Sequence, residues 1–187
     1  MIKKFIILFL ILIIPSKVFA LIEVDITRGN LNPLPLAVSP LSIDNESKKS
    51  FEKILEKENL GFEISNIIEN NLRTSGLFNP LSKDAFLQAP DIANLKPRFE
   101  DWNLIKAQAL ITGKVTYLNK KLRVEFRLWD VLAAKEMMAL AFTTVPNNWR
   151  RVGHIISDKV YERLTGEKGY FDTRIIYVAE EGSKTQR

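Results

Sequence analysis

The feature that most limits the possible folds is a helix followed by a strand near the carboxyl end of the chain. Apolar residues recur there at three- and four-residue steps, which places them on one stripe of a helix: Trp149, Val152, Ile156 and Val160. Gly166 follows, where a left-handed cap would end that helix. Residues 173–179 are then β-branched and aromatic, which is typical of a strand. A single strand needs partners for its backbone, so we expect this segment to open a second β-structure.

Three strand candidates precede the helix: Ala109–Tyr117, Lys121–Trp129 and Met137–Val145. Their short connections favour an antiparallel meander. The middle strand alternates most strictly, with every second residue apolar: Leu122, Val124, Phe126 and Leu128. This alternation predicts one face packed on a core and one face in water, with the Trp149 helix lying across the apolar face.

The upstream segments supply a second helix and short extended pieces. Apolar residues at helical spacing predict a helix that Gly76 ends, and they are Ile64, Ile67, Ile68 and Leu72. Residues 34–41 form an apolar run, but Pro35 and Pro40 should bound any strand there or confine it to a sheet edge. Residues 78–81 read as a short extended piece.

Three other segments are less regular. Residues 44–59 are strongly charged and read as a loop or a solvated helix. Residues 82–100 hold two prolines and no clear period, so we expect mostly loop, with a turn of helix at residues 84–86. Residues 101–107 could form a short helix with Trp102 and Ile105 inward. Together the elements predict an α/β fold, with two main helices packed on a mixed sheet of about five strands.

The first residues have the pattern of a secretory signal peptide. Lys3 and Lys4 precede an apolar run over residues 5–14, and Val18-Phe19-Ala20 offers small residues for cleavage between Ala20 and Leu21. The alternative is an uncleaved membrane anchor, but the run is shorter than the roughly 20 apolar residues that a span needs. Cleavage would remove three lysines and lower the net charge from +5 to +2. The basic precursor is therefore not evidence for nucleic-acid binding.

Few residues suggest catalysis or metal binding. His154 is the single histidine and there is no cysteine, so a zinc or copper site lacks ligands and a structural histidine is favoured. Ser157 and Asp158 lie on the same predicted helix as His154, where neighbours in sequence cannot form a nucleophile-base line. A basic strand face at Lys121, Arg123 and Arg127 is interrupted by an acid and reads as a solvated face. We expect no enzyme activity, no cofactor and no metal.

The residues that follow Ala20 form the strongest candidate for a partner-binding site. They alternate apolar and polar side chains as an amphipathic strand does: Leu21, Ile22, Glu23, Val24, Asp25, Ile26 and Thr27. A turn-rich break over residues 28–33 follows. Such a terminal strand can add to the sheet edge of another molecule. It can equally be the first strand of its own domain's sheet, and the pattern leaves both alternatives open.

Residues 149–178 resemble the TolB family, periplasmic β-propeller proteins of the Tol-Pal envelope system. The family's helix and strand motif is matched at Trp149, Arg150 or Arg151, Gly153, His154, Ser157, Asp158, Tyr161, Glu162, Leu164, Thr165, Gly166, Gly169, Phe171, Thr173, Arg174, Ile175, Tyr177 and Val178. Ile176 departs from it, since alanine is usual there. Residues 70–81 and 110–115 extend the resemblance upstream.

The resemblance implies a division of the chain and a role. Residues 1–20 would be the signal peptide, residues 21–169 the TolB-like α/β domain, and residues 170–187 the first strand of a propeller that this chain lacks. The role would be a periplasmic interaction protein that links TolA and Pal, supports outer-membrane integrity and helps to constrict that membrane during division.

In the family, the mature N-terminus engages the C-terminal domain of TolA, which carries over to Leu21–Thr27, whereas Pal binds the absent propeller. No nucleic acid and no membrane insertion after cleavage are implied. We also expect the tail from Phe171 to lack partners within this chain. The rival interpretation is an exported hydrolase whose catalytic part lies downstream.

Overall fold

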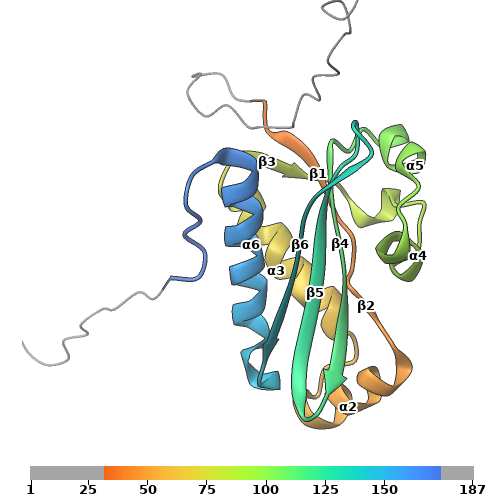
Figure 1. Ribbon diagram of the computed structural model, residues 1–187, viewed down its shortest axis with the longest axis vertical. Coiled ribbons are helices and arrows are strands. Elements are labelled where there is room, and N and C mark those ends of the chain that lie inside the picture. Colours follow the sequence, from red (N-terminus) through yellow and green to blue (C-terminus); the bar gives the residue numbers. More distant parts are fainter. Residues whose placement is uncertain (1–31, 174–187) are drawn as a thin grey trace, which may run out of the picture.

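The computed structural model describes residues 32–173, which form an α/β fold as predicted (Figure 1). One mixed sheet has the strand order β3-β1-β4-β5-β6, with β2 paired to β4 off this path. The strands are β1 (Leu34–Val38), β2 (Ser42–Ile43), β3 (Phe78–Pro80), β4 (Ala109–Leu118), β5 (Lys121–Asp130) and β6 (Lys135–Thr144). The helices are α2 (Asn45–Leu55), α3 (Leu60–Thr74), α4 (Pro90–Leu95), α5 (Phe99–Leu104) and α6 (Trp149–Thr165), with 3₁₀ turns at Lys83–Ala85 (η1) and Pro146–Asn148 (η2).

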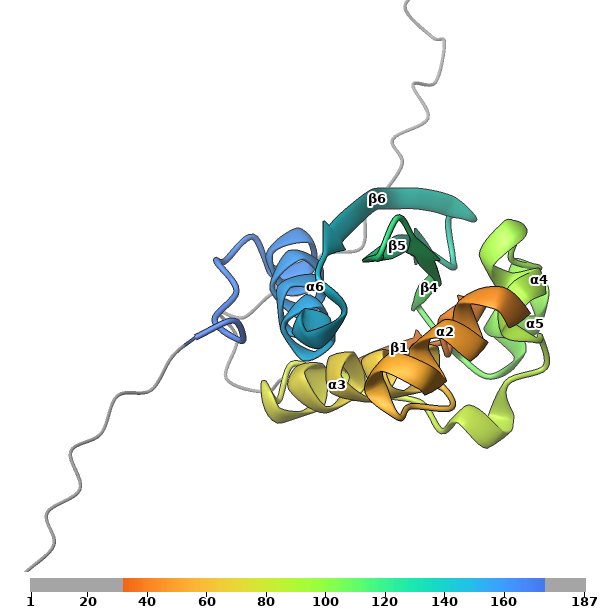
Figure 2. The same cartoon turned by 90° about the horizontal axis from the view of Figure 1, so that it is seen from below.

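The sheet lies between two unequal helical layers. Figure 2 shows α3 and α6 on one side of it and the short helices α4 and α5 on the other. The larger apolar core fills the space under α2, α3 and α6 and includes Phe51, Ile68, Phe126 and Ile156. A smaller core under α4 and α5 is built around Trp102, Leu110 and Val131. Both faces of the sheet therefore carry apolar cover, although only the first face has long helices.

The predicted meander and its covering helix are confirmed. β4 pairs with β5 in antiparallel register from Ala109 opposite Asp130 to Leu118 opposite Lys121, and β6 pairs with β5 in turn. The alternating apolar side chains of β5 are all buried, and so is the predicted stripe of α6. Gly166 ends α6 with a φ of 75°, in the left-handed conformation that the sequence predicted.

The two main helices pack closely because one contact position is a glycine. Asn59 caps α3 by accepting the N–H of Phe62, and Gly76 follows the helix with a φ of 76°. On α6, a Cβ atom at Gly153 would lie 2.8 Å from Cγ2 of Ile67 on α3. A larger residue would force the helices apart, so Gly153 sets their spacing.

The expectation that Pro35 confines its strand to a sheet edge is wrong. β1 is an interior strand, parallel to β3 on one side and to β4 on the other. The first pair with β4 joins Leu36 to Ala109, so Pro35 precedes that ladder. Its carbonyl still accepts the N–H of Gln108 at 3.0 Å. The missing proline donor therefore costs no ladder hydrogen bond, which is what normally excludes proline from interior strands.

The region from Ser82 to Glu100 is more helical than predicted. η1 covers the expected turn, but α4 was expected to be loop, and α5 begins two residues before the predicted short helix. Trp102 is buried as expected and Ile105 packs against the second core. The charged segment from residue 44 is a helix for most of its length, α2, whose N-terminus is capped by Asp44.

Candidate functional site

The predicted partner-binding residues Leu21–Thr27, and the cleavage site at Ala20 and Leu21, lie outside the described residues. The structure does limit where such a strand could join this sheet. β1 is already paired on both sides, and its first N–H, from Leu34, donates to the carbonyl of Leu77 at 2.9 Å. Among the described strands, β2, β3 and β6 each pair with one strand only. A strand preceding β1 can therefore pair at one of these three strands or with another molecule.

The basic strand face of β5 is a solvated face with its own carboxylates, as expected. Arg123 Nε lies 2.7 Å from Glu125 Oε1 on the same strand. Arg127 Nε lies 3.4 Å from Glu136 Oε2 on β6. Lys121 is exposed at the start of the strand. Local ion pairs engage both arginines, so this face does not present a row of unpaired cations.

The three polar residues of α6 that could suggest catalysis serve different contacts. The Asn71 side-chain amide of α3 donates to Ser157 Oγ at 3.0 Å and lies 2.9 Å from His154 Nδ1. Ser157 in turn donates to the carbonyl of Gly153. Asp158 instead accepts hydrogen bonds from the backbone N–H groups of Phe171 and Asp172. His154 and Ser157 thus join α3 to α6, and the structural interpretation of His154 is confirmed.

The best-defined polar site in the described part of the chain lies where the chain leaves α6. After Gly166 the backbone turns back along the helix, as the blue segment in Figure 1 shows. Asp158 Oδ1 accepts the N–H of Phe171 at 2.6 Å, and Oδ2 accepts the N–H of Asp172 at 3.1 Å. One carboxylate therefore accepts hydrogen bonds from two consecutive backbone N–H groups. Hydrogen bonds to a carboxylate are charge-assisted and stronger than neutral ones. We call residues 169–172 the strap.

Two further contacts hold the strap against α6. Arg151 donates from Nε and Nη2 to the carboxylate of Asp172, and this hydrogen bond and ion pair raise the pKa of Arg151. The Tyr161 ring meets Tyr170 and Phe171 edge-on, at centroid distances of 5.5 and 5.8 Å. Burial raises the pKa of Tyr161, with smaller contributions from neighbouring groups. The expectation that the tail from Phe171 lacks partners within this chain is therefore wrong for Phe171, and residues 174–187 of that tail lie outside the described residues.

Gly169 makes the close approach of the strap possible. A Cβ atom at this position would lie 2.4 Å from Cα and 2.6 Å from Cβ of Asp158. Both of these atoms are fixed in the helix, so they cannot move aside as the end of a long side chain could. Any side chain at residue 169 would lift the strap from α6.

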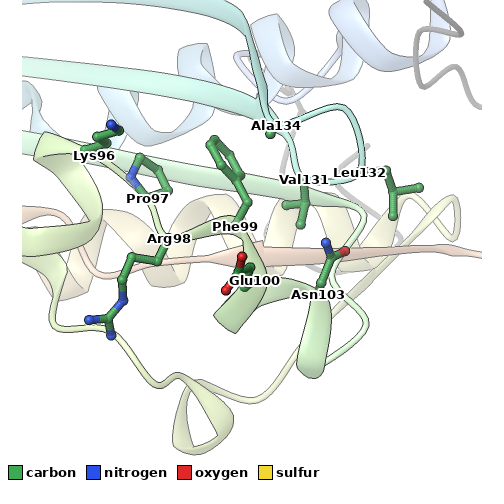
Figure 3. Close-up of a pocket in the computed structure, with 9 residues that line it drawn as sticks. All are labelled: Lys96, Pro97, Arg98, Phe99, Glu100, Asn103, Val131, Leu132 and Ala134. Carbon is green, nitrogen blue, oxygen red and sulfur yellow. The ribbon is translucent and has the colours of Figure 1, made fainter.

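A cavity of about 610 Å³ lies on the other side of the molecule, between the α4–α5 segment and the β5–β6 turn (Figure 3). Phe99 and Val131 form apolar parts of its wall, and Lys96, Arg98 and Glu100 also line it. Arg98 is engaged by Asp101, and Figure 3 shows its guanidinium directed away from Phe99 and Val131. The charged groups do not converge on one point, so the cavity identifies no ligand.

Residues 32–173 show neither a metal-binding cluster nor a membrane-spanning helix. No three acidic or histidine side chains lie close enough together there to hold a metal ion. No helix in that range is long and apolar enough to cross a membrane.

Sequence reasoning did not find the strap. Arg150 and Arg151 match a family motif position in the sequence, whereas the structure pairs Arg151 with Asp172. Sequence reasoning gave no role to Asp158 beyond excluding a catalytic one. The available signal was the pair of glycines at 166 and 169 directly after the helix, which indicates a chain reversal.

Known proteins resemble this chain along most of its length. Residues 22–137 match the family model described as the TolB amino-terminal domain. The Tol-Pal system protein TolB of Pelagibacter ubique (strain HTCC1062) is 82% identical over 178 residues, which is 95% of this chain and 40% of that protein. This chain therefore spans well under half the length of that relative.

A solved structure has the same fold. The crystal structure of TolB from Acinetobacter baumannii matches with a TM-score of 0.60 and 22% sequence identity, over 81% of this chain and 33% of the other. At this identity the match supports the fold alone. The family match and the identity to the Pelagibacter protein show that the chain belongs to the TolB family, and that it carries the family's amino-terminal domain.

Proposed function

We propose that this chain is a non-enzymatic, periplasmic interaction component of the Tol-Pal system. Its membership of the TolB family is the observation that carries this proposal. The proposed division is a signal peptide over residues 1–20, the α/β domain over residues 21–169, and the first strand of a propeller from residue 170. N-terminal sequencing of the exported chain should begin at Leu21, and recovery of the intact precursor in the membrane would contradict the assignment.

Within that role, residues 21–27 bind the C-terminal domain of TolA, whereas Pal binding belongs to the family's propeller and is assigned to no residue of this chain. The alternation of the segment supports the first of these contacts, because main-chain hydrogen bonds can extend a partner's sheet while Ile22, Val24 and Ile26 fill pockets. A second support is the interior position of β1, which leaves the preceding residues no place beside it. Linking the two membranes in this way would serve outer-membrane integrity and its constriction during division.

The test is a calorimetric titration of the chain that begins at Leu21 against the C-terminal domain of TolA. Deletion of residues 21–32 should abolish binding. Val24→Asp, on the apolar side of the alternation, should weaken binding at least about 10-fold, because a charge in an apolar pocket is costly. Thr27→Ser, which keeps a small polar group on the other side, is the matched control and should bind like the unsubstituted chain.

The deletion should leave the domain folded, since it removes residues ahead of β1 only. The urea midpoint of the truncated chain should therefore equal that of the longer chain. Undiminished affinity after deletion, with a normal midpoint, would exclude the N-terminal docking mode.

A further inference from the structure

We propose that the strap is a rigid extension of α6 that fixes the direction in which the following part of the chain leaves the domain, with Asp158 as its positioning residue. A segment between two structural units is a flexible tether when its backbone donors face solvent and its side chains lack contacts. Residues 169–172 have the opposite properties. The strap lies at the carboxyl end of the domain, so its restraint on the chain does not depend on TolA binding at the other end.

The hydrogen bonds of Asp158 fix the backbone, not only a side chain. Its two carboxylate oxygens receive the N–H groups of residues 171 and 172, at 2.6 and 3.1 Å. Holding two consecutive amides restrains the orientation of the peptide plane between them. The direction of the chain at Asp172 is thereby set relative to the axis of α6.

Contacts on both sides of this carboxylate add to the restraint. Toward the N-terminus of α6, Arg151 holds the Asp172 side chain through both oxygens. Toward its C-terminus, Tyr161 packs against Tyr170 and Phe171, and Phe171 also packs against the larger core. The strap is therefore held along about three turns of the helix, from residue 151 to residue 161.

At Gly169 the strap lies so close to α6 that no side chain would fit between them. The backbone of α6 occupies the space that a side chain at residue 169 would need, since Asp158 Cα lies only 2.4 Å from the ideal Cβ position. Substitution of this one residue should therefore release the strap without touching α6. Gly169→Ala and Asp158→Ala thus test the same contact from opposite sides.

The absence of cysteine makes the measurement direct, because two spin labels can be placed without removing native thiols. Labels at Lys121→Cys, exposed on β5, and Thr173→Cys, exposed at the end of the strap, report the position of the strap relative to the sheet. The unsubstituted strap should give one narrow distance distribution. Asp158→Ala and Gly169→Ala should each broaden it, and the amides of Phe171 and Asp172 should exchange at least about 10-fold faster.

Glu162→Ala is the matched control, because Glu162 is an exposed carboxylate on α6 that pairs with Lys159 and not with the strap. It should leave the distribution narrow and the two amides protected. Exchange of the β5 amides should be unchanged in all three variants, which separates release of the strap from unfolding. A broad distribution in the unsubstituted chain, or no effect of Gly169→Ala, would overturn the proposal. If Asp158→Ala fails to fold, Gly169→Ala decides alone.

Discussion

Trp149 is the side chain that joins the start of α6 to its surroundings. Its ring is only 4% exposed, and the guanidinium of Arg150 lies 4.3 Å from its centroid. The ammonium of Lys57 approaches the ring at 5.8 Å. Two cationic groups therefore lie over a buried ring, and removal of the ring would leave a cavity at the start of α6.

Trp149→Ala should lower the free energy of unfolding by roughly 3–5 kcal/mol, through lost burial and the cavity left behind. This is a large fraction of the approximately 5–15 kcal/mol that stabilises a typical domain. Urea titration followed by circular dichroism measures the change. Leu132→Ala is the control, because that side chain is 64% exposed and should change stability by less than about 0.5 kcal/mol. An unchanged midpoint for Trp149→Ala would contradict the burial of the ring.

At the scale of elements, the long regular segments were predictable and the short ones were not. The alternation of β5 and the stripe of α6 identify those elements, because each repeats its pattern over several turns or residue pairs. The helix α4 is six residues long, too short to show a period, and its position depends on packing of Ala93 against the second core. The prediction that Pro35 confines its strand to a sheet edge was wrong because the effect of a proline depends on the register with β4. That register cannot be read from the local sequence.

The strap escaped prediction for the same reason. Asp158 and Asp172 are ordinary surface residues in the sequence, and only the chain reversal after α6 brings them to the same place. Candidate site residues 21–27 were predicted from a local pattern and stay a prediction, since they lie outside the described residues.

The junction between α3 and η1 depends on a carboxylate. Glu69 of α3 accepts hydrogen bonds from Lys83 of η1 and from Arg73. Burial by itself would raise the pKa of Glu69, but these two cations outweigh it, and the pKa lies below its ordinary value of 4.5. The ionised form is therefore favoured in the folded state, and its contribution to stability is present above pH 4.5 and lost as the pH falls through the lowered pKa.

Glu69→Gln should consequently destabilise the domain at pH 7, by about 1 kcal/mol, as expected for a partly buried charged hydrogen bond. The difference from the unsubstituted chain should shrink as the pH is lowered to about 3. Urea midpoints at several pH values measure this. Glu162→Gln, an exposed carboxylate, should show a much smaller effect at every pH. A difference for Glu69→Gln that grows on acidification would reverse the sign and contradict the assignment.

The whole molecule is a sheet covered on one face by α3 and α6 and on part of the other by α4 and α5, and it is built from one local part and one distant part. β4, β5 and β6 follow each other directly, with the turn after Leu118 joining the first two. β1 instead lies between β3 and β4, with Leu34 opposite Phe78 and Leu36 opposite Ala109. The sheet can therefore be completed only after a long segment of chain has closed on itself.

This position of β1 bears on the order in which the chain folds. Local hairpins close at a small entropic cost, whereas parallel pairing across a long loop is slow. In refolding kinetics, Leu122→Ala in β5 should therefore slow folding, with a φ-value of about 0.5 or more. Leu36→Ala in β1 should mainly speed unfolding, with a φ-value below about 0.3. The reverse ranking would contradict this order.

During synthesis β1 emerges before its partners β3 and β4 exist. Of the described strands, β1 is therefore made first and is expected to pair last. Until β1 pairs, the edge of β4 is open to other chains.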